Sequence, residues 1–212
     1  MMTDGDGIYS RLSGHGIAHG TETFTLHVAA SLVAIAMQEA RRSGQPVTVG
    51  LGLAPWELRA LFLDLFPGAA ELLEGFRGEP GEPEKDECAL RDILWYHAAG
   101  TSTFERMLVK MIARRCQRPN HLWQDLGLGN RSQLGLLMQR YFPVLASRNV
   151  SDMKWKKFFY RTMCSSTGFT MCTAPVCSEC DDFDACFGPE DGESLLAAVR
   201  NDRPIKAWET RL

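Results

Sequence analysis

Residues 22–44 read ETFTLHVAASLVAIAMQEARRSG and contain the longest apolar stretch of the chain. Large apolar side chains recur there at steps of four and three, at Phe24, Val28, Leu32 and Ile35. This spacing is typical of a helix that buries one face. Arg41 and Arg42 lie in its last turn, where cations suit the negative end of the helix dipole, and Gly44 follows. The stretch predicts a long core helix, in which His27 is expected to be a hydrogen-bonded core histidine.

The same spacing recurs on the C-terminal side of this helix, and we find no convincing strand run and no internal repeat. Helices are expected over residues 56–66 with Pro55 at the start, then 69–76, 88–99 and 103–116, a short helical turn over 121–128, a helix from Asn130 to Pro143, and one over 149–163. Thr101 or Ser102, Asn130, and Ser151 or Asp152 are the expected helix caps. Residues 46–52 and 77–87 are expected to be loops because of their glycines and prolines. The fold class is therefore predicted to be all-α.

The predicted organisation is a single helical domain with a C-terminal cysteine-rich loop that binds a metal cluster. Residues 1–20 are rich in glycine and polar residues, and we expect a disordered N-terminal arm there. Residues 21–163 form the predicted helical domain, and residues 164–200 form the predicted cluster-binding segment. The length of 212 residues suits one domain with a short appended segment.

Charge and composition exclude several classes of protein. A formal net charge of −3 provides no basic field for nucleic acid, and no partner of that kind is expected. The stretch 24–37 is too short to span a bilayer, which needs about 20 residues, so no membrane partner is expected. The first 20 residues lack the apolar core of a signal peptide, and seven cysteines without such a signal indicate a reducing compartment. We therefore expect a soluble cytoplasmic protein.

Four cysteines form a compact C-x4-C-x2-C-x5-C run at Cys172, Cys177, Cys180 and Cys186. Thiolates bind soft metal centres, and four of them this close together can converge on one inorganic cluster. The first three match the C-x4-C-x2-C part of plant-type ferredoxin ligation, whereas the fourth follows sooner. A zinc site usually takes its ligands as two pairs with a structured segment between them, and that segment is missing here. The run favours a metal–sulfur cluster over zinc or disulfides.

Other polar groups have less specific patterns. Cys88 and Cys116 are expected to be buried small side chains, and Cys164 is either a fifth thiolate or a core thiol. The acids near the run, among them Asp184 and Glu190, are each expected to be solvated. If these acidic side chains are not simply solvated, they would serve as ligands of a harder metal ion or as a docking patch for a basic partner.

Two further groups allow a functional interpretation. His121 and Asp125 are spaced i, i+4, so they share a helix face and are candidates for metal binding, although a hydrogen-bonded histidine is commoner. Lys154, Lys157 and Arg161 form a basic helix face that would attract an oxyanion or offset an anionic cluster, unless it is only solvated. No nucleophile–base pair, phosphate loop or paired carboxylates stand out, so turnover chemistry is not indicated and the protein is not expected to be an enzyme.

Several long segments together resemble the nitrogen-fixation protein family NifQ. They are HLWQDLGL at 121–128, DMKWKKFFYR at 152–161, the cysteine run, and CFGPEDGES at 186–194. The resemblance is close over about residues 116 to 200 and loose over the preceding helices. Several long matches in the same order are specific, whereas the cysteine spacing alone would be only suggestive.

The resemblance implies a molybdenum–iron–sulfur protein that processes molybdenum and donates it for assembly of the nitrogenase iron–molybdenum cofactor. Cys172, Cys177, Cys180 and Cys186 are then the implied ligands of a Mo–Fe–S cluster made of molybdenum, iron and sulfide. The implied partners are the cofactor-assembly scaffold and the nitrogenase iron protein, with molybdate as the metal source. Two alternatives are a small iron–sulfur electron-transfer protein and a zinc-stabilised interaction module.

Overall fold

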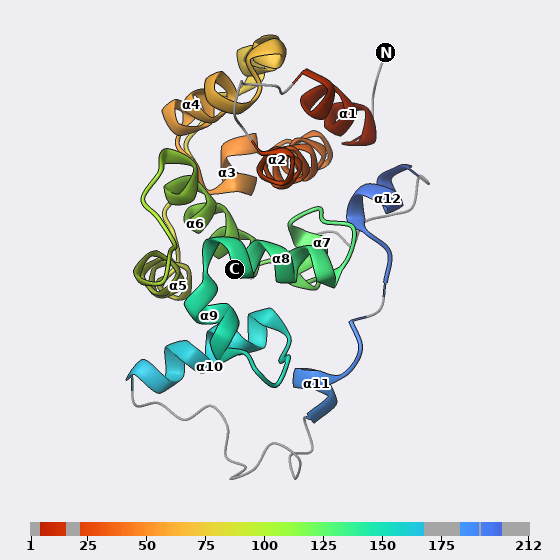
Figure 1. Cartoon of the computed structure of the whole chain (residues 1–212). Helices are drawn as coiled ribbons and strands as arrows, with labels where there is room; N and C mark the ends of the chain where they lie inside the picture. The colour runs from red at the N-terminus through yellow and green to blue at the C-terminus, as the bar shows by residue number, and fades with distance from the viewer. Residues whose placement is uncertain (1–4, 16–21, 168–182, 191, 201–212) are drawn as a thin grey trace.

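The computed structural model describes residues 5–15, 22–167, 183–190 and 192–200, and within these ranges the chain is all-α (Figure 1). The predicted fold class is confirmed for this part of the chain. The elements are α1 (Gly5–His15), α2 (Thr23–Ser43), α3 (Val47–Leu51), α4 (Pro55–Leu65), the 3-10 helix η1 (Pro67–Gly75), α5 (Lys85–Tyr96), α6 (Thr103–Cys116), α7 (Leu122–Asp125), α8 (Arg131–Tyr141), α9 (Pro143–Arg148), α10 (Trp155–Thr167), α11 (Phe183–Phe187) and α12 (Leu195–Arg200).

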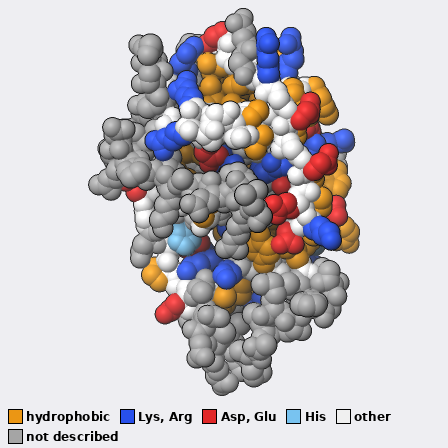
Figure 2. Space-filling model, turned by 180° about the vertical axis from the view of Figure 1, so that it is seen from behind, with side chains coloured by type: hydrophobic (Ala, Val, Ile, Leu, Met, Phe, Trp, Pro, Cys, Tyr) orange, Lys and Arg blue, Asp and Glu red, His pale blue; other side chains and the backbone are white. Residues whose placement is uncertain are grey.

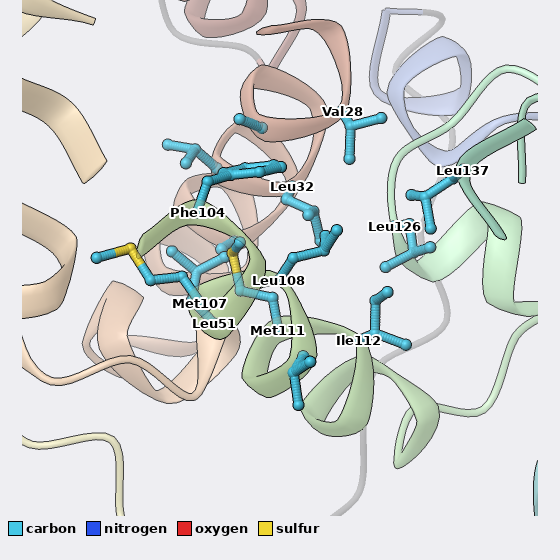
Figure 3. Packing of buried hydrophobic residues seen from close by; sticks show 14 of the residues in the cluster. Val28, Leu32, Leu51, Phe104, Met107, Leu108, Met111, Ile112, Leu126 and Leu137 are labelled. Carbon is cyan, nitrogen blue, oxygen red and sulfur yellow. The ribbon is translucent and has the colours of Figure 1, made fainter. Parts of the chain in front are cut away.

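Helix α2 is the central element of the fold, as the sequence predicts. Every one of its twelve buried residues lies between Leu26 and Gln38, so its middle is covered on all sides rather than on one face. Gly44 ends the helix in the left-handed conformation, and its N–H donates to the Ala40 carbonyl. In Figure 3, Leu32 of α2 and Leu108 of α6 belong to one apolar cluster, with Leu126 and Leu137 beside them.

By length and composition, α2 is a helix that would suffice to cross a membrane. The sequence predicts otherwise for the shorter apolar stretch 24–37, which is too short to span a bilayer. Within the described part of the chain, however, two thirds of its most apolar window is buried by protein. The packing is that of a core helix.

The N-terminal residues Gly5–His15 differ from the expected disordered arm, because they form α1. Ile8 is 3% exposed and Leu12 is fully buried, and α1 packs against α2 and η1. Two apolar side chains four residues apart are enough to bury one helix face, although glycines flank them. The other boundaries of the predicted domains stay predictions.

His27 is a hydrogen-bonded histidine at the meeting point of three helices, as expected. Its Nδ1 lies 2.8 Å from the hydroxyl of Tyr9 in α1. Its Nε2 lies 3.0 Å from Oε1 of Gln133 in α8. Both ring nitrogens are therefore used in joining α1 and α8 to α2.

Two of the predicted caps are confirmed. Ser102 Oγ accepts from the Glu105 amide at 3.2 Å, and the Glu105 carboxylate accepts from the Ser102 amide at 2.9 Å. Asn130 Oδ1 accepts from the Gln133 amide at 3.0 Å and caps α8. The expected loop at 46–52 is wrong in part, because Val47–Leu51 forms α3 against α2. Four of its five residues are buried (Val47, Thr48, Gly50 and Leu51), and this burial outweighs the weak local helix signal.

The helix expected from residue 149 begins instead at Trp155, and neither Ser151 nor Asp152 caps it. The Asn149 side chain binds both backbone groups of Met153, accepting from its N–H and donating to its carbonyl, each at 2.9 Å. Asp152 has a positive φ of 51° between them. Hydrogen bonds from a side chain to nearby backbone groups compete with the backbone hydrogen bonds of a helix. The chain therefore forms a tight turn here, and α9 and α10 are separate helices.

Gly127 lets the end of α7 lie directly against α2. Its φ is +72°, and a Cβ placed on it would come within 2.8 Å of the Ser31 carbonyl oxygen. Only glycine accepts both the left-handed backbone and this close approach. The contact fixes α7, and with it the polar side chains of residues 120–125, on the core helix.

Candidate metal-cluster site and its anchor

The described structure contains one end of the cysteine run. Cys172, Cys177 and Cys180 lie outside the described residues, whereas Cys186 belongs to α11 and is half-buried. The helices on the two sides of residues 168–182, α10 and α11, lie at the same end of the molecule (Figure 1). The described residues contain no group of three or more His, Cys, Asp or Glu side chains that would hold a metal ion. The assignment of the four ligands therefore stays a prediction.

Cys186 is tied to the start of α10 through its backbone. The Lys154 amide donates to the Cys186 carbonyl at 2.9 Å, and the Lys154 ammonium donates to the Asp184 carbonyl at 2.8 Å. Lys154 is also the residue whose carbonyl accepts the first hydrogen bond of α10, from Phe158. Its N–H is thus one of the donors that a helix start leaves unpaired, and the Cys186 carbonyl satisfies it.

Glu190 provides a second attachment, which the sequence pattern did not reveal. Its side chain is only 5% exposed and forms an ion pair with Arg131, and its Oε1 lies 3.3 Å from His121 Nδ1. Arg131 also donates to Oδ1 of Asp152 at 2.7 Å and to its carbonyl at 2.9 Å. Burial acts to lower the pKa of Arg131, but these hydrogen bonds to Asp152 and Glu190 raise it. We call His121, Arg131, Asp152 and Glu190 the Glu190 clamp.

A third contact extends this attachment toward α12. The Gln124 side chain of α7 donates to the Glu193 carbonyl at 2.9 Å. Segments 121–131, 152–154 and 184–193, far apart in the chain, therefore meet around the residues that follow the cysteine run. Three of the segments that carry the family resemblance contribute to this contact.

His121 and Asp125 have separate roles rather than forming one metal site. His121 is the N-cap residue of α7 and faces Glu190. Asp125 is 1% exposed, binds the Lys156 ammonium at 2.5 Å and accepts from the Asn120 amide at 2.9 Å. Burial raises the pKa of Asp125, and Lys156 acts in the opposite direction. Asp125 is thus engaged in an ion pair between α7 and α10.

The cysteines outside the run differ from one another. Cys116 is buried as expected, and burial raises the pKa of its thiol to about 12, which makes it unreactive at neutral pH. The expectation that Cys88 is buried is wrong, because Cys88 is exposed in the first turn of α5. Leu90 and Leu94 supply the buried face of that helix instead. Cys164 lies within α10, and its side chain is outside the described part of the structure.

Not all of the basic residues expected on one face of α10 are exposed. Lys154 is used in holding α11, while Lys157 and Arg161 are exposed. On the face of the molecule in Figure 2, acidic and basic side chains are interspersed rather than gathered by sign.

Breaking the Glu190 clamp is expected to loosen the segment that carries Cys186. Hydrogen bonds to charged groups contribute about 1.5–3 kcal/mol, so Glu190→Ala should speed hydrogen exchange in residues 183–193 by more than about tenfold. Asp184→Ala is the matched control, because the Asp184 side chain is exposed and only its carbonyl is used. Mass spectrometry of the exchanged peptides measures the effect. Equal exchange in both variants would contradict the role of the clamp.

A comparison with known protein families matches most of the chain and reaches residue 188 of this site. A family model described as NifQ matches residues 28–188, which include most of α2, the Lys154 attachment and all four cysteines of the run. The chain belongs to the NifQ family. No solved structure matches this NifQ-family chain.

Two of three curated relatives match over most of the chain, and the third over a shorter part of it. A protein NifQ homolog of Sinorhizobium fredii (strain NBRC 101917 / NGR234) is 38% identical over 174 residues, covering 81% of this chain and 75% of the relative. Protein NifQ of Rhodobacter capsulatus is 36% identical over 159 residues, covering 75% of this chain and 87% of the relative. Protein NifQ of Klebsiella pneumoniae is 47% identical over 81 residues, or 38% of this chain and 48% of the relative.

Proposed function

We propose that this NifQ-family protein carries a molybdenum–iron–sulfur cluster and donates its molybdenum for assembly of the nitrogenase iron–molybdenum cofactor. The observation that carries the proposal is the family match over residues 28–188, which spans the whole cysteine run together with the Lys154 attachment of Cys186. Membership of the family implies a role in molybdenum provision. The cluster and its ligands are the finer part of the proposal.

The donor set fits such a cargo. Cys172, Cys177, Cys180 and Cys186 provide four soft thiolate ligands within 15 residues, which suits iron and sulfur-bound molybdenum better than a harder cation. Cys186 is half-buried and its backbone is hydrogen-bonded to Lys154. The backbone of Cys186 is fixed and the residue is partly exposed. Both features support a cluster that binds to the helical domain and can still be transferred to a partner.

In this proposal the protein is a carrier rather than an enzyme, and it works in the cytoplasm. Its partners are those that the family implies: the cofactor-assembly scaffold and the nitrogenase iron protein, with molybdate as the metal source. Thiolate and sulfide ligands convert an oxyanion-derived metal into a sulfur-bound form. The charge of Lys154 lies next to the run and offsets the negative charge of a thiolate cluster.

The proposal is tested by loading the purified full-length chain anaerobically with iron and sulfide, with and without molybdate. Elemental analysis and electron paramagnetic resonance measure the product, and molybdenum is then followed into an acceptor protein. We expect a brown protein with both metals that loses molybdenum to the acceptor. Iron and sulfide without molybdenum, with reversible redox cycling and no metal loss, would indicate an electron-transfer protein. A colourless, air-stable zinc protein would indicate an interaction module.

A further inference from the structure

A shallow groove of about 520 Å³ lies between α8 on one side and α9 with the start of α10 on the other. Its volume falls within the range of binding pockets, roughly 300–1,000 Å³. The apolar part of its lining comes from Gly135, Leu136, Ala146 and Trp155, and the remaining lining residues are polar or charged. Two of these, Arg131 and Asp152, belong to the Glu190 clamp. The groove therefore adjoins the attachment of the segment that carries Cys186.

The fold does not require a glycine at position 135. Gly135 lies in the interior of α8, where glycine is the least favourable residue apart from proline. Its φ is not positive, and a Cβ placed on it would meet no described atom within 4 Å. Gly127 differs, because both its backbone conformation and its contact with α2 exclude a side chain. At Gly135 the missing side chain instead leaves the groove open, so another molecule can approach the helix backbone closely.

Leu136, the next residue of α8, is 55% exposed. A single exposed leucine is ordinary on a protein surface. Here, however, it lines a concave surface together with Ala146 and Trp155. Apolar side chains in a hollow with a few polar groups around them are typical of sites that receive a side chain of another molecule. The groove therefore fits an apolar side chain of a partner, placed over Gly135.

The charge that the groove presents to solvent is negative. Arg131 is paired with two carboxylates, those of Asp152 and Glu190. Glu190 is buried and also lies beside His121, whereas the side chain of Asp152 is 83% exposed. With His121 neutral, this group has one cation and two carboxylates. Its excess negative charge can be reached by a partner at the exposed carboxylate of Asp152.

The cations that are closest in sequence to the other groove residues bind elsewhere. Lys154 and Lys156 bind groups of α11 and α7. Arg148 contacts the C-cap residue of α5, and Arg140 pairs with the N-cap residue of α2. None of these four residues lines the groove. A lysine or arginine of a partner protein is therefore the complementary group for Asp152.

We propose that this groove is the docking site of the protein that accepts molybdenum from this chain. The acceptor inserts an apolar side chain over Gly135 and places a lysine or arginine beside Asp152. Docking there brings the acceptor next to the Glu190 clamp, and thus next to the segment that carries Cys186. The role of the partner as a molybdenum acceptor rests on the proposed function, whereas the open groove and its charge do not.

The test measures binding of the full-length chain to the purified cofactor-assembly scaffold and, separately, to the nitrogenase iron protein by biolayer interferometry. The cluster-loaded chain and a cluster-free Cys177→Ala chain are both used. Gly135→Gln fills the groove with a side chain that helices favour, so binding should weaken by about tenfold or more while the urea midpoint stays the same or rises. Gly135→Ala should raise the urea midpoint and weaken binding less. Gly14→Gln is the matched control, because a Cβ on Gly14 of α1 also meets no described atom within 4 Å.

Asp152→Asn tests the charge of the groove. Asparagine tolerates the left-handed backbone conformation of Asp152 and has nearly the same size, so the turn should persist. Loss of one exposed ion pair should weaken binding by about twofold to fivefold and make it less sensitive to salt. Weaker binding with an unchanged salt dependence would indicate only a loosened Glu190 clamp and would contradict the charge contact.

Weaker binding in Gly135→Gln, with undiminished stability and with wild-type affinity in Gly14→Gln, would support the docking site. Equal affinity in Gly135→Gln and the unchanged chain, or no binding of either protein to the unchanged chain, would overturn it. Lower stability of Gly135→Ala would show that the fold needs this glycine and would remove the basis of the proposal. Self-association that Gly135→Gln abolishes would assign the groove to a second copy instead. Docking without any transfer of molybdenum would keep the groove and overturn the proposed function.

Discussion

Replacing Cys177 or Cys180 by Ala is expected to abolish the brown absorbance of the loaded protein while leaving most of its helical circular dichroism. Two thiolates separated by two residues reach neighbouring atoms of one cluster, and the loss of either leaves a metal without a ligand. The described helices have a continuous apolar core of their own. The fold should therefore persist without the cluster.

Cys88→Ala is the matched control for these variants, because Cys88 is exposed in α5 and outside the run. Anaerobic loading followed by visible absorption and iron analysis measures the result. Full cluster absorbance in Cys177→Ala and Cys180→Ala would remove both residues from the ligand set. Loss of absorbance in Cys88→Ala would show that the run alone does not provide the ligands.

Replacing Lys156 by Met is expected to lower the free energy of unfolding by about 3–5 kcal/mol, the cost of leaving one charge of a buried pair alone. The Lys156 ammonium binds Asp125 at 2.5 Å and the Arg118 carbonyl at 2.5 Å, so the variant loses the only described cation on the Asp125 carboxylate. Lys157→Met is the matched control, since Lys157 is the exposed neighbour on the same helix. Urea unfolding followed by circular dichroism measures both variants.

The loss in Lys156→Met should depend on pH. Burial already raises the pKa of Asp125 above its ordinary value, and Lys156 opposes this rise. Without Lys156 the folded-state pKa rises further, so the folded chain binds a proton more readily than the unfolded chain. Stability then falls as pH rises from the unfolded pKa to the folded pKa. We expect a smaller loss at about pH 5 than at neutral pH, and adding Asp125→Asn should remove this difference. An equal loss at both pH values would contradict the buried-charge explanation.

Local patterns predicted much of the helical body. The apolar steps from Phe24 to Ile35 predicted α2, and the polar residues Ser102 and Asn130 predicted two caps that the structure confirms. These features depend on residues within a few positions of one another, so the sequence carries them directly. The turn at Asn149 also depends on nearby residues. There the Asn149 side chain hydrogen-bonds the Met153 backbone in place of helical hydrogen bonds, and the apolar pattern did not reveal this.

The sequence by itself determined the α-helical class, the core helix, the cysteine run and the resemblance to NifQ. Only the tertiary structure decided what surrounds that run. Glu190 was expected to be solvated, yet it is buried against Arg131, 59 residues earlier in the chain. Asp125 was a candidate metal ligand, yet it is paired with Lys156, 31 residues later. Charged side chains have the same sequence signature on a surface and in a buried pair, because the partner is chosen by helix packing and not by local spacing.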